Sequence, residues 1–132
     1  MTETHMTIRE MCDAFDVTPR TLRFYEAKEL LFPERQGNRR LFTRRDRARL
    51  KLILKGKRFG FSLEEIRQTL DLYDPQQNNL PQMLRAYKLG KERLVDLEER
   101  RRELDEVIED LKAQLDVGDK MIAAAQMTTA AE

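Results

Sequence analysis

The segment TPRTLRFYEA, residues 18–27, carries the clearest fold signal in the chain. Thr18 supplies a side-chain oxygen that can accept a hydrogen bond from an orphan backbone N–H, and Pro19 suits the first position of a helix. Leu22 and Tyr25 follow one helical turn apart and face inward. The segment therefore predicts a helix that begins after Thr18 and runs to about Leu30.

A shorter helix is predicted immediately upstream. Thr7 and Glu10 have the spacing of a capping box, in which each side chain satisfies the other's backbone N–H. The apolar residues that follow fall at i, i+3, i+4 and i+7: Ile8, Met11, Cys12 and Phe15. Only Asp16 and Val17 separate this helix from the next cap. Two short helices and a tight turn predict a helix-turn-helix.

The pattern changes between residues 31 and 42. Pro33 stops the helix, and Gln36, Gly37 and Asn38 are turn formers. The residues at 40–42, Arg-Leu-Phe, suit a strand. We expect a small β-hairpin, or wing.

Two more helices are predicted after the wing. Thr43 with Asp46 caps a helix at 44–59, and Ser62 with Glu65 caps one at 63–73. The third helix is expected to turn Leu50, Ile53 and Leu54 inward. Its cations are expected to lie largely off that face: Arg45, Arg49, Lys51 and Lys55.

The second half of the chain predicts a hinge, a long helix and a tail. Residues 74–81 form a polar linker bracketed by prolines, residues 82–117 carry a heptad pattern, and residues 118–132 are expected to be a flexible tail. One seam position holds Tyr87, Leu94, Arg101, Ile108 and Leu115, and the other holds Gly90, Leu97, Leu104 and Leu111. A lone helix cannot bury such a seam, so we expect a dimer. Arg101 either extends to solvent or sets the register by pairing with Glu98 or Glu99.

The near-neutral net charge of +1 hides two opposite excesses. Residues 1–60 hold 15 Lys/Arg against 8 Asp/Glu, and residues 61–132 hold 10 against 16. The basic excess is densest between Arg20 and Arg58, with 14 cations against 4 acids. A run of cations is often just a solvated face. Its density on the second helix, the wing and the third helix favours an anionic partner such as nucleic acid.

Several classes of protein find no support in the composition. One cysteine, Cys12, and one histidine, His5, give neither a disulfide nor a metal site, and no cofactor motif or acid pair indicates an enzyme. Cys12 on an apolar helix face is expected to be a small buried hydrophobe. Without a leader or a long apolar run, a cytoplasmic protein with no membrane contact is expected.

Three motifs in order resemble the MerR family of bacterial transcription regulators. They are RTLRFYEAKELL at 20–31, PERQGNRRLFT at 33–43 and, after a basic helix, GFSLEEI at 60–66. The resemblance covers residues 7 to about 73. It implies a mainly α fold in which a winged helix-turn-helix DNA-binding domain, residues 1–73, precedes a long dimerisation helix that forms an antiparallel coiled coil.

The resemblance also implies roles for particular residues. Recognition-helix contacts to DNA are implied for Arg20, Arg23 and Tyr25, wing contacts for Arg35, Arg39 and Arg40, and backbone contacts for Lys55 and Arg58. Dimerisation is implied for Tyr87, Leu94, Leu97, Arg101, Leu104, Ile108 and Leu111. At 38–40 the wing has Asn-Arg-Arg where the family usually has Gly-Tyr-Arg, so Arg39 replaces an aromatic and its contact is expected to be electrostatic.

The implied function is that of a homodimer on double-stranded promoter DNA. Such regulators distort the spacer between the −35 and −10 elements, so RNA polymerase is affected through the DNA, with activation or repression as the outcome. The alternative is a nucleic-acid-binding adaptor whose coil recruits a partner. No separate sensor domain is expected. Residues 50–74 also resemble a MerR subgroup associated with branched-chain amino acid and fatty-acid breakdown, which implies an acyl-CoA-like effector.

Overall fold

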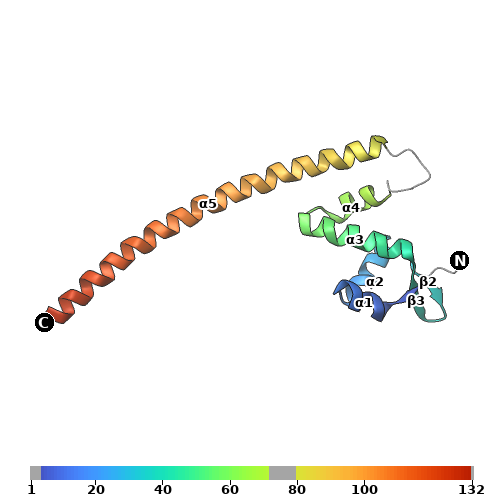
Figure 1. Ribbon diagram of the computed structural model, residues 1–132, viewed down its shortest axis with the longest axis horizontal. Helices are drawn as coiled ribbons and strands as arrows, with labels where there is room; N and C mark the ends of the chain where they lie inside the picture. Colours follow the sequence, from blue (N-terminus) through green and yellow to red (C-terminus); the bar gives the residue numbers. More distant parts are fainter. Residues whose placement is uncertain (1–3, 72–79, 132) are drawn as a thin grey trace. The chain divides into compact units, whose positions relative to one another are not determined.

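The structure, a computed structural model, describes residues 4–71 and 80–131. The chain divides into two units, residues 1–89 and 90–132, which are considered separately. The elements, in chain order, are β1 (Met6–Thr7), α1 (Ile8–Phe15), α2 (Pro19–Ala27), β2 (Glu34–Gln36), β3 (Arg39–Phe42), α3 (Arg44–Phe59), α4 (Leu63–Leu70) and α5 (Leu80–Ala131) (Figure 1). The expected fold class is confirmed: mainly helical, with a small wing and a long C-terminal helix.

All four predicted helix caps are present. Thr7, Thr18, Thr43 and Ser62 each accept a hydrogen bond from a backbone N–H in the first turn of their helix. The short Asp46 still completes its capping box, with 3.1 Å from the Thr43 backbone nitrogen to its Oδ2. Local capping chemistry therefore correctly predicted where α1, α2, α3 and α4 begin.

The second helix ends earlier than predicted, at Ala27 instead of about Leu30. Glu29 takes a left-handed backbone with φ 60°, and the Leu30 N–H donates to the Tyr25 carbonyl at 2.9 Å. This is the Schellman arrangement, which reverses the chain direction at a helix end. The reversal places both Leu30 and Leu31 in the core, where each is fully buried.

The wing pairs with a strand that the sequence did not reveal. The sheet order is β1-β3-β2, antiparallel throughout, and the two-residue β1 pairs Met6 with Phe42. The turn between β2 and β3 contains Gly37 with φ 64°, a conformation that favours glycine. The sheet ties the start of the chain to the wing.

The core gathers side chains from α1, α2, β3, α3 and α4 and from the segment that follows α2. Its buried apolar members are Met11, Leu22, Tyr25, Leu30, Leu31, Phe42, Leu50, Ile53, Ile66 and Leu70. Helix α4 approaches α3 closely at Gly56, where an added Cβ would lie 2.8 Å from Cγ1 of Ile66. Such a contact leaves no room for a side chain, so glycine sets the distance between these helices.

One prediction for α3 is wrong: Arg49 is buried, with 6% of its surface exposed. Its Nε donates to the Leu30 carbonyl at 2.7 Å, and its guanidinium carbon lies 5.3 Å from the Phe32 ring centroid. The Asp71 carboxylate lies 4.0 Å from Nη2. Arg49 occupies the core face because the chain leaving α2 needs a donor there, which an apolar residue cannot supply.

The predicted boundaries around α5 also need correction. Helix α4 ends at Leu70, before the predicted end at Tyr73. Tyr73 and residues 74–79 of the predicted hinge lie outside the described residues. Helix α5 begins at Leu80 and includes Pro81 in its first turn, where proline is tolerated. The tail predicted to be flexible is helical through Ala131, because one glycine at 118 costs only about 1 kcal/mol and the flanking residues are good helix formers.

The role of Arg49 gives a stability prediction. Arg49→Ala leaves the buried Leu30 carbonyl without its donor, so the free energy of unfolding should fall by about 1–3 kcal/mol. The matched control is Arg45→Ala, which removes an exposed cation from the same helix and should change stability by less than about 0.5 kcal/mol. Urea denaturation at one protein concentration measures both. Equal effects of the two substitutions would contradict the role of Arg49 in holding the chain that leaves α2.

Candidate nucleic-acid interface

Two of the predicted recognition residues project from α2 into solvent. Arg20 and Arg23 are exposed and lie one helical turn apart. Phe24, to which the sequence assigned no role, is also exposed, and the Lys28 ammonium lies 5.7 Å from its ring centroid. Helix α2 therefore presents cations and an aromatic ring on its outer surface.

Tyr25 occupies the inner side of α2. Its side chain is buried, and burial raises the pKa of its hydroxyl. Its ring centroid lies 5.9 Å from that of Phe24 at an interplanar angle of 50°. Tyr25 thus supports the core, as its helical spacing indicated, and a contact of its hydroxyl with a phosphate stays a prediction.

The wing arginines meet a carboxylate from α2. Arg35 on β2 and Arg40 on β3 are directly opposite in the strand register. Both donate to Glu26: Arg35 Nη2 lies 2.7 Å from Oε1, and Arg40 Nε lies 2.9 Å from Oε2. We name these three residues the Glu26 clamp. The clamp joins the wing to α2, a connection that sequence reasoning missed; the isolated acid between Arg23 and Lys28 was the available signal.

The clamp changes the acidity of its carboxylate. Partial burial raises the pKa of Glu26, but the hydrogen bonds and charges of Arg40 and Arg35 lower it more, so the pKa lies below its ordinary value. Glu26 is therefore ionised at neutral pH. In that state the carboxylate accepts charge-assisted hydrogen bonds, which are stronger than neutral ones.

The remaining predicted cations lie on the surface of the same unit. Arg39 at the start of β3 is exposed, as are Lys55 and Arg58 in the C-terminal half of α3. Further exposed cations on α3 are Arg44, Arg45, Lys51 and Lys57. The unit that contains α2, the wing and α3 thus exposes many cations, and polyanions bind such surfaces through phosphate neutralisation.

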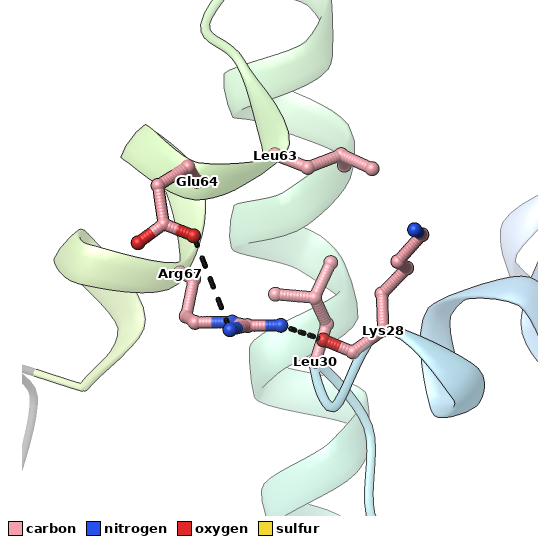
Figure 2. A pocket seen from close by; sticks show the side chains of 5 residues that line it. All are labelled: Lys28, Leu30, Leu63, Glu64 and Arg67. Carbon is pink, nitrogen blue, oxygen red and sulfur yellow. Dashed lines mark hydrogen bonds and ion pairs between the residues drawn. The ribbon is translucent and has the colours of Figure 1, made fainter.

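A pocket of about 230 Å³ lies between the end of α2 and α4 (Figure 2). Its lining residues are Lys28, Leu30, Leu63, Glu64 and Arg67. The Arg67 guanidinium donates to the Lys28 carbonyl and lies 3.9 Å from the Glu64 carboxylate. Because its guanidinium already has these partners, Arg67 connects α4 to the end of α2, and the pocket is a structural junction.

Residues capable of metal or redox chemistry are sparse in the described ranges. Residues 4–71 and 80–131 contain no group of three or more His, Cys, Asp or Glu placed to hold a metal ion. Cys12 is half-buried, and burial together with Asp13 raises the pKa of its thiol despite the opposing charge of Arg23. The thiol is therefore protonated at neutral pH. His5 lies 2.9 Å from the Glu34 carboxylate and joins the beginning of the chain to β2.

Helix α5 exposes its apolar seam. The exposed fraction lies between 40% and 67% for Tyr87, Leu94, Leu97, Leu104, Ile108, Leu111 and Leu115. Arg101 is exposed as well. Within the described residues no helix is long and apolar enough to cross a membrane. An apolar stripe of this length on a charged helix is typical of coiled-coil pairing.

The Glu26 clamp should make stability depend on pH. Because the folded-state pKa of Glu26 lies below the unfolded one, the clamp stabilises the fold above about pH 4.3, and this contribution is lost as pH falls through the folded-state pKa. Urea denaturation across a pH series should therefore show the largest difference between wild type and Glu26→Gln near neutrality. The difference should shrink in acid; one that does not vary with pH would contradict the ionic clamp.

Known proteins resemble this chain in sequence and in fold. Residues 6–72 match the family model described as MerR HTH family regulatory protein, and residues 47–114 match the model described as MerR, DNA binding. The chain is 36% identical over 100 residues to the HTH-type transcriptional regulator ZntR of Escherichia coli strain K12. The aligned region covers 74% of this chain and 69% of ZntR.

A second relative and a solved structure are also transcriptional regulators. The HTH-type transcriptional regulator YfmP of Bacillus subtilis strain 168 is 32% identical over 124 residues, covering 92% of this chain and 83% of YfmP. The crystal structure of a MerR family transcriptional regulator from Bacillus cereus superposes with a TM-score of 0.59 at 31% identity, covering 76% of this chain and 75% of that one. The chain therefore belongs to the MerR family, and it is a DNA-binding transcriptional regulator rather than an enzyme.

Proposed function

We propose that the protein binds promoter DNA as a homodimer and distorts the spacer between the −35 and −10 elements. Each subunit places α2 in a major groove while its wing contacts the flanking backbone. RNA polymerase then responds to the altered DNA, without direct contact to the regulator. The observation that carries the proposal is the combination of exposed cations on α2, the wing and α3 with an exposed apolar seam on α5.

The proposed contacts divide into two kinds. Arg20 and Arg23 project from α2, where a guanidinium can bind a guanine edge through two hydrogen bonds or clamp a phosphate. Arg39, Lys55 and Arg58 lie on the wing and α3 and are assigned to phosphates. The proposed DNA contacts also include the Tyr25 hydroxyl and two arginines that already donate to Glu26, Arg35 and Arg40.

The seam of α5 is proposed to pair with the same seam of a second subunit in an antiparallel coiled coil. Its apolar members would lose their exposure to water, which is the driving force for association. Arg101 interrupts the stripe and would either extend past the interface or pair with Glu98 or Glu99. A dimer matters for DNA binding because two linked heads bind two half-sites with a higher effective concentration.

Arg23→Ala tests how the recognition helix reads DNA. On a duplex selected by the wild-type protein from a random library, binding should weaken by about 1–3 kcal/mol if Arg23 contacts a base edge, with a smaller loss on a shuffled duplex. Fluorescence anisotropy with both duplexes measures this. The control Arg102→Ala removes the same charge from α5 and should leave both affinities nearly unchanged. Equal losses on the two duplexes would make Arg23 a phosphate contact.

Leu104→Glu tests the dimer. A carboxylate at the centre of the seam would be buried without a partner, so the variant should elute as a monomer of 15.7 kDa by light scattering where the wild type is a dimer. The control is Val95→Glu, which changes an equally exposed apolar residue away from both seam positions and should stay dimeric. A dimeric Leu104→Glu would contradict the proposed interface.

A further inference from the structure

Glu26 lies between two arginines that face each other across the wing. Because Arg35 and Arg40 are paired directly in the strand register, their like charges would destabilise the hairpin without an acid between them. We propose that Glu26 is a positioning residue, which holds the wing where both wing and recognition helix contact one duplex. The inference rests on the proposed DNA contacts of those two elements.

The geometry of the clamp suits this role. One carboxylate serves both strands: Oε1 accepts from Arg35, and Oε2 accepts from Arg40 Nε, which also lies 3.4 Å from Oε1. The Glu26 side chain is only 20% exposed, so water screens these interactions less than at an open surface. Two strands and one helix are therefore joined through a single side chain.

The clamp also leaves the wing arginines able to bind DNA. A guanidinium carries five N–H donors, so a carboxylate that accepts one or two of them does not exhaust it. The Arg35 side chain is 52% exposed, and its contact with Glu26 restricts the direction in which its other donors point. Such restriction reduces the entropy lost when a phosphate binds.

An acid on a DNA-facing helix repels phosphates, so the positioning role and simple electrostatics predict opposite results. If Glu26 acted only through its charge, its removal would strengthen binding to every duplex. If it positions the wing, its removal weakens binding to the preferred sequence, since the two elements no longer fit the same site. Glu29 is a matched control because it is exposed, lies close in sequence and carries the same charge.

The first experiment compares Glu26→Gln and Glu29→Gln on two DNA probes. One probe is a duplex selected by the wild-type protein from a random library, and the other is a shuffled duplex of the same composition. For Glu26→Gln the ratio of the two affinities should fall about tenfold, while binding to the shuffled probe is unchanged or stronger. Glu29→Gln should keep the wild-type ratio. An unchanged ratio in Glu26→Gln would overturn the proposal.

A second experiment needs no DNA. Hydrogen exchange of the β2 and β3 amides in the free protein should be faster in Glu26→Gln and in Arg40→Gln, and the double variant should be no faster than either. Unchanged exchange in Glu26→Gln would overturn the clamp. If the wild type selected no sequence from the library, the proposed function would fail, whereas the exchange rates would still decide whether Glu26 holds the wing.

Discussion

The path of the chain out of the recognition helix is the constraint on which the DNA-binding unit depends. At this point the backbone has left α2 and has not yet reached the wing, so its polar groups need partners from α3. Arg49 supplies a donor for the Leu30 carbonyl, and Asp46 accepts from the Phe32 N–H at 2.9 Å. Asp46 also closes the cap of α3. Two charged side chains thus hold the recognition helix, the wing and α3 as one assembly.

This constraint explains how scattered cations can act together. Arginines on three elements bind one duplex only if the elements keep their relative positions, since a misplacement of about 1 Å weakens a directional contact. The bracing by Arg49 and Asp46 orients the chain as it enters the wing, and Glu26 attaches the wing to α2. In the proposed complex, the exposed cations attract DNA, and the buried polar contacts fix the relative positions of the elements that bear those cations.

The two halves of the chain carry opposite net charges. Residues 1–60 carry an excess of 7 positive charges and residues 61–132 an excess of 6 negative charges. In the proposed dimer the basic half attracts phosphates. The acidic half is repelled by them, so it stays away from the DNA, and its apolar seam pairs the two subunits. A net charge of +1 describes neither half.

Much of the fold could be predicted from interactions between neighbours in sequence. The rest depends on contacts between residues that are distant in sequence, which could not be predicted. The caps at Thr7, Thr43 and Ser62 and the turn at Gly37 depend on neighbours in sequence, so their positions could be predicted. The burial of Arg49 could not be predicted from residue type, although its spacing from Leu50 and Ile53 matches the core face. Its partner, the Leu30 carbonyl, is supplied by a loop 19 residues away. The clamp on Glu26 likewise depends on strand register.

The most direct measurement of the central claim is hydroxyl-radical footprinting on a duplex that the protein selects from a random library. Two heads joined by a coil should protect two symmetry-related half-sites, with altered cleavage at the spacer between them where the duplex is distorted. Uniform protection that follows no sequence and disappears steeply with salt would contradict the account. That result would favour an adaptor that holds nucleic acid without reading it.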